Sequence, residues 1–406
     1  MRLRLWLEAA SQSFWAPPAA AMLIGGALGF IVPEFDNASN GVFGIFSTSE
    51  FQSARSLLEV IATVTVSVAG ITFSVTIVVL QLASQQLGPR VLHTFQSRWI
   101  GRITLATFLG VFVYSLTALG RLGSVTENPN LVLTIAVTAA IAAFVLFTVF
   151  IHDIVISIRP STVIRRIGAD AQGTLEHLFP SGIGQDPDDT QTASTLLAGR
   201  MSELPSATAA AGSSGYLAAI DSSLIETARE ADGFVSQTVM IGDFVVTGEE
   251  LASVAAPSEP DQLAERIAKA FQISPSRSLV KDVAFPIRQL ADLALRALSP
   301  SLNDPTTAEN AAGAITEALV RFAEVERVEA LRADSEGKPR FRALAPDLDG
   351  LVRLGFEQIR PCAADDPLLP RRLLHLFGQV ERAALAAGRS TAEIERQAKL
   401  VRDATD

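Results

Sequence analysis

Long apolar stretches without charges dominate the first 160 residues of the chain. A helix needs about 20 apolar residues to cross the hydrocarbon core of a bilayer, which is roughly 30 Å thick. Four stretches reach or approach this length, at residues 14–32, 57–83, 103–119 and 131–151. Pro33 and Glu34 follow the first stretch, where a signal peptide would have a small-residue cleavage site, so we expect a retained helix. The pattern predicts a four-helix transmembrane domain over residues 1–160.

Arginines near the four stretches predict their orientation, because basic residues accumulate on the cytoplasmic side of membrane proteins. One side of the predicted domain carries Arg2, Arg4, Arg90, Arg98, Arg102, Arg159, Arg165 and Arg166. The opposite side carries only Arg55 and Arg121, which lie among Glu34, Asp36, Glu50 and Glu127. We therefore expect a multi-pass protein of a bacterial inner (plasma) membrane with both termini in the cytoplasm.

After residue 160 the apolar runs shorten and their periodicity changes. Residues 161–212 are expected to form a connecting helix and a flexible linker rich in Ser, Thr, Ala, Gly and Asp. Residues 213–258 alternate over short runs between glycine turns, which predicts a small β module. Residues 259–406 carry apolar residues at spacings of three and four, which predicts a helical domain. The predicted fold class is a membrane α-helical protein with four transmembrane helices followed by a cytoplasmic α+β domain.

The β module has a sequence pattern of its own, Val239-x-x-Gly242-Asp243-x-Val245-x-x-Gly248-x-x-Leu251. This pattern resembles the half-barrels of biotinyl and lipoyl carrier domains. Those carriers need a lysine that is modified, and residues 167–268 contain no lysine. We therefore expect a half-barrel-like shell without a swinging cofactor arm.

A polar stripe runs along the second apolar stretch. With 3.6 residues per helical turn, its members fall within an arc of about 80° and extend over about 39 Å. They are Glu59, Thr63, Ser67, Gly70, Ser74, Gln81 and Gln85, with Ile77 as the one apolar residue on the same line. Polar groups are costly against lipid, so this face must meet protein or water. Several copies around an axis would line a pore, with Glu59 as a carboxylate ring at its outer mouth and Ile77 as a hydrophobic constriction.

The alternative interpretation of the stripe is a packing seam. Small residues at these spacings also allow two helices to approach closely. A second polar line of Thr65, Thr72 and Thr76 lies on the opposite face, and threonine can bond to its own backbone. Polarity alone therefore does not identify a pore.

The segment 299–307 separates two predicted helices. Asp304 followed by Pro305 is a favourable helix start, and Thr306 can begin a capping box at a slightly later position. The structural interpretation is a helix–helix corner. The alternative is a ligand site that uses Asn303, Asp304 and Thr307.

Charge and composition narrow the classes of function. The chain has 406 residues, with 33 Lys+Arg against 43 Asp+Glu and a net charge of −10. The acidic excess lies after residue 160, where 36 acidic residues outnumber 25 basic ones, so nucleic-acid binding is not expected. A single cysteine, Cys362, excludes a disulfide framework and a thiolate metal site within one chain.

The sequence contains none of the motifs GxxxxGK[ST], GxGxxG, HExxH or GxSxG, which would indicate nucleotide binding or hydrolase chemistry. The four histidines lie far apart and form no ligand pair. We therefore expect no enzymatic activity, no cofactor and no bound metal.

Several strings carry a resemblance to a known family. They include Ala69-Gly70-Ile71-Thr72-Phe73-Ser74, Gly88-Pro89-Arg90, Gly242-Asp243-Phe244-Val245 and the long string from Arg296 to Ala308, RALSPSLNDPTTA. With these strings the chain resembles, over almost its whole length, a bacterial family of predicted membrane proteins catalogued as domain of unknown function 2254. The resemblance implies four spans followed by a cytoplasmic domain. It implies no activity, because the family has no assigned chemistry.

Together these patterns predict a homo-oligomeric ion channel that conducts inorganic cations through a pore lined by the second transmembrane helix, with a cytoplasmic regulatory or assembly domain. The first alternative is a non-conducting membrane scaffold or signalling protein whose stripe is a packing seam. The second is an envelope enzyme or ligand-binding protein with a site near Asn303 and Asp304.

Overall fold

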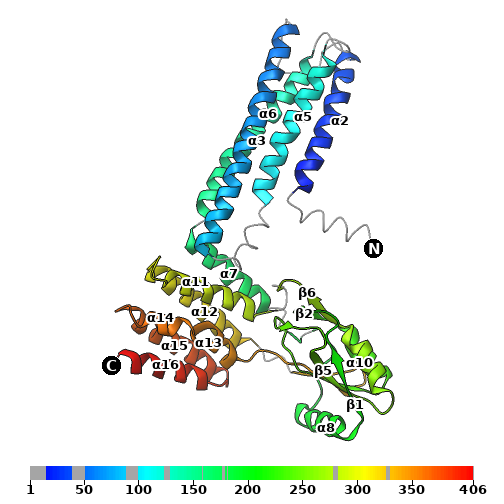
Figure 1. Cartoon of the computed structure of the whole chain (residues 1–406), viewed down its shortest axis with the longest axis vertical. Helices are drawn as coiled ribbons and strands as arrows, with labels where there is room; N and C mark the ends of the chain where they lie inside the picture. The colour runs from blue at the N-terminus through cyan, green and yellow to red at the C-terminus, as the bar shows by residue number, and fades with distance from the viewer. Residues whose placement is uncertain are drawn as a thin grey trace. The chain divides into compact units, whose positions relative to one another are not determined.

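Figure 1 shows the computed structural model of the chain. The structure describes residues 15–38, 51–87, 99–122, 129–157, 159–175, 179–180, 182–277, 282–325 and 330–405. Contacts divide the chain into two compact units, residues 1–162 and 163–406, which we describe separately as unit 1 and unit 2.

The described part of unit 1 consists of four long helices, α2 (Ala16–Ala38), α3 (Phe51–Leu87), α5 (Trp99–Arg121) and α6 (Asn130–Ser157) (Figure 1). All four are long and apolar enough to cross a membrane, which confirms the four predicted apolar helices. Each helix extends beyond its apolar stretch, and α3 reaches 37 residues. Four of the arginines that predict the orientation, Arg2, Arg4, Arg90 and Arg98, lie outside the described residues.

Helix α5 lies at the centre of unit 1 and contacts α2, α3 and α6. One buried cluster, toward the C-terminal end of α5, joins Leu58, Tyr114 and Leu133 with their neighbours. A second cluster, toward the other end of α5, joins Ala69 and Phe108 with α6. These two clusters hold α3 and α6 against α5.

Glycines allow α2 and α5 to approach closely. A Cβ on Gly25 would overlap the carbonyl oxygen of Gly110, and a Cβ on Gly29 would lie 2.6 Å from the carbonyl oxygen of Tyr114. Small residues four positions apart bring helix backbones together in this way in membrane proteins. Larger side chains at these two positions on α2 would force the helices apart.

The C-terminal end of α2 caps the start of α6. The side chain of Asp36 is fully buried, and its Oδ2 accepts hydrogen bonds from the backbone N–H groups of Leu131 at 2.8 Å and Val132 at 3.0 Å. The hydroxyl of Tyr114 donates to the carbonyl oxygen of Val132 at 3.1 Å. The first N–H groups of a helix lack intrahelical partners and favour negative charge. The carboxylate from α2 therefore supplies the hydrogen-bond acceptor for the first N–H groups of α6.

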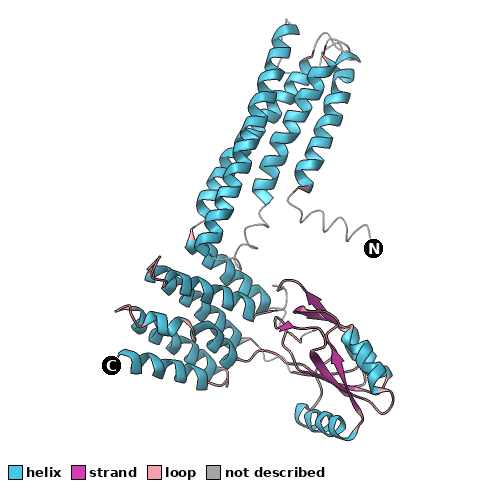
Figure 2. Cartoon of the chain, in the orientation of Figure 1, coloured by secondary structure: helices cyan, strands magenta, loops and turns pink. Residues whose placement is uncertain are grey.

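Unit 2 contains two small sheets (Figure 2). The larger has the strand order β1-β5-β3-β8-β7, in which only β3 and β8 pair in parallel. The smaller, antiparallel sheet has the order β4-β2-β6. The strands are β1 (Ser206–Ala210), β2 (Gly215–Ile220), β3 (Phe234–Gln237), β4 (Phe244–Val245), β5 (Glu250–Ala255), β6 (Phe271–Ser274), β7 (Leu331–Ala333) and β8 (Pro339–Arg342).

Helices make up the rest of the described part of unit 2. Helices α8, α9 and α10 contact the sheets, whereas α11 to α16 contact one another. The helices are α7 (Pro160–Leu175), α8 (Thr190–Glu203), α9 (Ser223–Glu230), α10 (Pro260–Ala268), α11 (Ala284–Ala297), α12 (Pro305–Glu324), α13 (Leu348–Phe356), α14 (Ile359–Ala363), α15 (Leu369–Ala386) and α16 (Ala392–Thr405). The α+β composition predicted for this part of the chain is confirmed.

The strands extend beyond the range in which the β module was expected, 213–258. Strand β1 and helix α8 lie in the expected linker, and β6, β7 and β8 lie in the range expected to be helical. The eight strands form two sheets and not one half-barrel. The reason is that β3 pairs with β8 across about a hundred residues, a contact that no local pattern encodes.

The turn at Gly242 and Asp243 rests on a buried ion pair. Gly242 has a φ of +94°, and a Cβ there would overlap the carboxylate of Asp282. Arg277 Nη2 lies 2.7 Å from Asp282 Oδ2. Burial raises the pKa of the Asp282 carboxyl above its usual value, and the neighbouring guanidinium of Arg277 works against that rise. Glycine is therefore required at this turn by both backbone conformation and space.

Candidate functional site

Helix α3 packs against its own bundle through one face. Its buried residues follow one another at spacings of four and three: Ala54, Leu58, Ala62, Thr65, Ala69 and Thr72. Thr65 and Thr72 are two of the three threonines of the second polar line, and their hydroxyls donate to backbone carbonyls of the same helix, at 2.6 Å to Ile61 and 2.8 Å to Val68. This polar line is therefore part of the core of unit 1.

The polar stripe lies on the far side of α3. At 100° per residue, the centre of the stripe is about 140° from the centre of the buried face. Every member is exposed: Glu59, Thr63, Ser67, Gly70, Ser74, Ile77, Gln81 and Gln85. No atom of the described residues lies within 4 Å of a Cβ built on Gly70. The described residues leave this face exposed, so lipid, water or another molecule can meet it.

Glu59 forms an ion pair within α3. Its Oε1 lies 3.0 Å from Arg55 Nε, and the two side chains keep 49% and 55% of their accessible surface. The predicted carboxylate at the mouth of the stripe is thus accompanied by a guanidinium one helical turn away. An exposed pair of this kind is only weakly bound, so the carboxylate can turn toward another partner at little cost.

Two hydroxyls of the stripe are satisfied by α3 itself. Thr63 donates to the carbonyl oxygen of Glu59 at 2.8 Å, and Ser67 donates to that of Thr63 at 2.7 Å. A hydroxyl bonded to its own backbone can face an apolar environment more easily than a free one. These contacts fit a packing seam as well as a pore.

Aromatic and charged residues indicate where a bilayer would lie around unit 1. Trp15 and Trp99 stand at the starts of α2 and α5 and are 62% and 64% exposed. Glu34 and Arg121, toward the other ends of these helices, form an ion pair at 2.6 Å. Tryptophan favours the membrane interface, and the intervening helix lengths of about 28 Å and 33 Å match a bilayer core.

The polar stripe is longer than the bilayer core that lies between the tryptophans at one end of unit 1 and the Glu34–Arg121 pair at the other. The rings of Trp15 and Phe73 lie 6.1 Å apart, so α3 passes the interface near Phe73. Helix α3 continues for about 21 Å beyond that point. Gln81 and Gln85 therefore lie past the tryptophan level. The part of the stripe within the core extends from Glu59 to Ser74.

The segment 299–307 forms a helix–helix corner between α11 and α12. Asn303 has a φ of +45°, and Asp304 is the N-cap of α12 with Pro305 in its first turn. The Oδ1 of Asp304 accepts from Thr307 N–H at 3.0 Å, and its Oδ2 accepts from the Thr307 hydroxyl at 2.6 Å. Thr306 is exposed. A ligand site at this loop stays a prediction.

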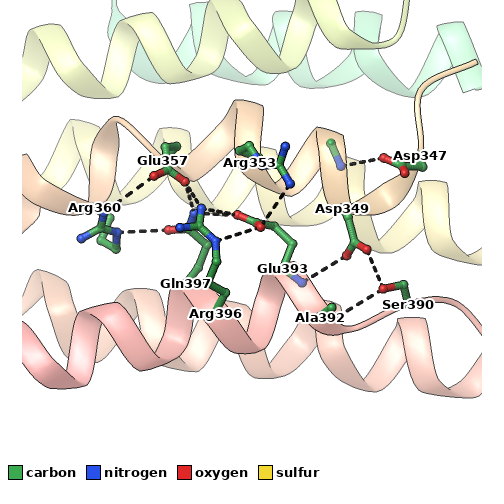
Figure 3. Close-up of polar contacts among 11 residues, drawn as sticks. Asp347, Asp349, Arg353, Glu357, Arg360, Ser390, Ala392, Glu393, Arg396 and Gln397 are labelled. Carbon is green, nitrogen blue, oxygen red and sulfur yellow. Dashed lines mark hydrogen bonds and ion pairs between the residues drawn. The ribbon is translucent and has the colours of Figure 1, made fainter.

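A polar cluster between α13, α14 and α16 had no counterpart among the sequence-based predictions (Figure 3). Glu393 of α16 is buried, and its carboxylate accepts from Arg396 at 2.7 Å and from Gln397 at 2.9 Å. Glu357 accepts from Gln397 at 2.6 Å and also pairs with Arg396. Arg353 lies 3.5 Å from Glu393. The carboxylates of Glu357 and Glu393 thus share one guanidinium, that of Arg396, and one amide, that of Gln397.

The same cluster fixes the start of α16. Asp349 of α13 accepts from Glu393 N–H at 3.2 Å and from the hydroxyl of Ser390 at 2.5 Å (Figure 3). Burial disfavours the charge of Glu393, but the bonds from Arg396 and Gln397 outweigh it and hold the pKa of its carboxyl below the usual range. Every polar group of the cluster has partners, so it serves to fix the position of α16.

Groups that could hold a metal are absent from the described part of the chain. No three or more His, Cys, Asp or Glu side chains come together there in a way that would bind an ion. Cys362 is exposed and forms no disulfide. The exposed polar face of α3 is therefore the candidate functional site of unit 1.

Comparison with known proteins identifies the family. The family model described as "Predicted membrane protein (DUF2254)" matches residues 11–379. The chain belongs to the DUF2254 family. The resemblance drawn from its sequence strings is thereby confirmed. A DUF2254 protein is a predicted membrane protein of unknown function, and α16 lies after the matched range.

Two similar proteins come from mycobacteria. They are the uncharacterized protein Rv1290c of Mycobacterium tuberculosis and the uncharacterized protein Mb1321c of Mycobacterium bovis, each 29% identical over 367 residues. The aligned part covers 86% of this chain and 68% of each relative. No solved structure matches the chain significantly.

Proposed function

We propose that this DUF2254 protein is a homo-oligomeric ion channel of the bacterial inner membrane, and that inorganic cations pass along the polar face of α3. One observation carries the proposal: all eight members of the stripe are exposed and point away from the bundle of their own chain. In this arrangement both termini are cytoplasmic and unit 2 is the regulatory or assembly element. Several copies turned toward one axis would place each stripe in water instead of lipid.

The residues beside the stripe support such an assembly. Exposed apolar side chains lie along one flank, among them Val60, Val64 and Ile71. Val66 and Phe73 are exposed on the other flank. A polar line between two apolar flanks is the pattern expected of a helix that lines a lumen and touches a neighbour on each side.

Charge favours cations as the permeant ions. Glu59 is the one acidic residue of the stripe, and the stripe contains no Lys or Arg, which an anion pore would use at its constriction. Arg55 sits beside Glu59 and reduces its field, so we expect modest selectivity between cations and anions.

A non-conducting scaffold or signalling protein is the second candidate. The observation that favours it is the bonding of the Thr63 and Ser67 hydroxyls to their own backbone, which leaves them suited to a dry helix–helix seam. In that case the same face of α3 meets a second copy, but no water path opens.

Cysteine cross-linking tests the shared element of both candidates, contact between α3 helices. Because Cys362 is the single cysteine, a Cys362→Ser background is free of thiols. Ser67→Cys in that background should form disulfide-linked dimers in membranes. Leu23→Cys on α2, a lipid-exposed control at 77% exposure, should form none. Equal cross-linking of both variants, or of neither, would contradict an α3 interface.

Cation flux into proteoliposomes separates the channel from the scaffold. Glu59→Gln should lower the ratio of cation to anion permeability. Glu34→Gln is the matched control, because Glu34 is another exposed carboxylate of unit 1 that lies off the stripe. Absence of flux at varied voltage and pH, together with Ser67→Cys cross-links, would establish the scaffold and exclude the channel.

A further inference from the structure

Helix α7 has two chemically different faces. Its buried face consists of residues of unit 2, namely Val163, Ile164, Ile167, Gly168, Ala171, Thr174 and Leu175. Gly168 packs near Ala314 of α12, which marks the side on which the bundle lies. On the opposite side Arg165 and Arg166 are exposed, and Arg159 is exposed just before the helix begins.

These three arginines lack the ion pairs that many arginines of unit 2 have. Eleven arginines in the described part of unit 2 lie within 4.0 Å of a carboxylate. Among the described residues, no carboxylate comes that close to Arg159, Arg165 or Arg166. Residues 154–169 contain these three arginines and no Asp or Glu, although the chain after residue 160 is acidic. Asp170, one helical turn after Arg166, is the carboxylate that acts on this segment: burial raises the pKa of its carboxyl, and the charge of Arg166 works against that rise. The three arginines therefore outnumber the acidic residues of the segment and keep a positive excess without an ion pair.

Chain connectivity keeps this patch close to the end of a membrane helix. Helix α6 passes the start of α5 where the ring of Phe150 lies 3.3 Å from a Cβ built on Gly101, and it ends at Ser157, about 10 Å further on. Helix α7 begins three residues later, which is at most about 11 Å of chain. The headgroup layer is about 5–8 Å thick on each side of the core, so Arg159, two residues after the end of α6, lies near its outer edge.

We propose that Arg159, Arg165 and Arg166 form a binding surface for anionic phospholipid headgroups. The guanidinium group donates a planar pair of N–H groups that matches phosphate oxygens. The buried face of α7 belongs to unit 2, so lipid bound at the arginine face ties the first helix of that unit to the bilayer surface. This surface does not depend on whether α3 conducts ions.

Lipid binding by the purified full-length chain in neutral detergent tests the proposal. Native mass spectrometry would measure the affinity for phosphatidylglycerol and for phosphatidylcholine. The wild-type chain should prefer phosphatidylglycerol, and the variant Arg159→Gln/Arg165→Gln/Arg166→Gln should bind it about 100-fold more weakly, equivalent to about 1 kcal/mol per arginine. Addition of sodium chloride should weaken binding to the wild type and have little effect on the variant.

Two controls keep the test specific. Arg371→Gln/Arg382→Gln removes two exposed arginines of α15 that also lack ion pairs among the described residues, and it should leave phosphatidylglycerol affinity unchanged. Glycerol phosphate in solution should not compete. Equal losses in both variants would show a nonspecific charge effect, an unchanged triple variant would show that lipid binds elsewhere, and competition by glycerol phosphate would show a site for soluble anions. Each of these results overturns the proposal.

Discussion

Replacing Asp36 should destabilise unit 1 more than any exposed charge change at the same end of the bundle. Asp36→Ala removes a fully buried carboxylate that accepts two backbone hydrogen bonds, 2.8 Å and 3.0 Å long, at the start of α6. It leaves two backbone N–H groups without their acceptor, that of the partly buried Leu131 and that of the buried Val132. Water cannot easily replace the lost oxygen, because the surrounding side chains belong to the buried cluster around Tyr114 and Leu133.

The expected decrease in the free energy of unfolding follows from the two lost hydrogen bonds and from the lost charge at the helix start. Leaving a buried backbone donor unsatisfied costs about 1–3 kcal/mol, and loss of negative charge at a partly buried helix start adds up to about 2 kcal/mol. Because the two donors share one oxygen, the terms overlap, and we expect a decrease of about 3 kcal/mol in the free energy of unfolding. Asp36→Asn keeps an acceptor oxygen and should lose only about 1 kcal/mol.

Tryptophan fluorescence during titration with denaturing detergent measures this change. All three tryptophans, at positions 6, 15 and 99, lie in unit 1, so the signal reports its unfolding and not that of unit 2. Glu34→Ala is the control, since its pair with Arg121 is exposed and should contribute less than about 1 kcal/mol. If Asp36→Ala and Glu34→Ala shift the transition equally, the carboxylate does not cap α6 in the way described.

Three further changes should have distinct outcomes. Gly25→Val should prevent α2 from packing on α5 and shift the fluorescence transition, whereas Gly70→Ala, on the uncovered face of α3, should leave it unchanged. Gly242→Ala should reduce the thermal stability of unit 2 by more than the roughly 1 kcal/mol expected at Gly248, where φ is +86° but space is open. The depressed pKa of Glu393 contributes stability that is lost as pH falls below about 4.5, so the protection factors of the α16 amides, which are corrected for intrinsic exchange, should fall in acid. Glu393→Gln should make those protection factors less dependent on pH.

The long elements of the chain were predictable from local pattern. A membrane helix must be long and continuously apolar, a requirement that loops rarely meet by accident. The C-terminal helices were also predictable, because their buried faces repeat at spacings of three and four. Helix α11, from Ala284 to Ala297, lies in the range 259–406 that was expected to be helical. The continuous apolar stretch and the spacing of three and four each extend over many residues, so a few exceptions do not hide them.

Strands β7 and β8 escaped prediction, unlike the short strands between glycine turns in 213–258, and the reason is physical. Strand β7 has three residues and β8 has four, too few positions to display an alternating pattern. Strand β7 falls inside 259–406, the range expected to be helical, although α12 ends at Glu324 before the strand begins. What creates the strands is their pairing with each other and with β3, which depends on residues far away in the sequence.

The sequence also did not reveal which charged side chains are buried. The hairpin of β7 and β8 looks like an exposed polar turn, yet the side chains of Arg340 and Asp334 keep only 4% and 0% of their accessible surface and pair at 2.8 Å. Asp36 likewise appears in the sequence as one acid among several beyond the first span. Residue type predicts that a charge will be satisfied, but not whether water or a buried partner satisfies it.

For the polar stripe, periodicity predicted which residues share a face but not the direction of that face. Helix α3 has two polar faces, and the one with small alanines packs against α5 because close approach is favoured there. Glu59 is already paired and Gln81 lies past the tryptophan level, so the uncovered polar groups within the bilayer core reduce to Thr63, Ser67, Gly70 and Ser74. A dry seam would tolerate Ser74→Ala, because alanine packs as closely as serine. A water-filled path would lose a polar group at the inner end of its section within the bilayer core, so the same change should reduce cation flux while leaving cross-linking at residue 67 intact.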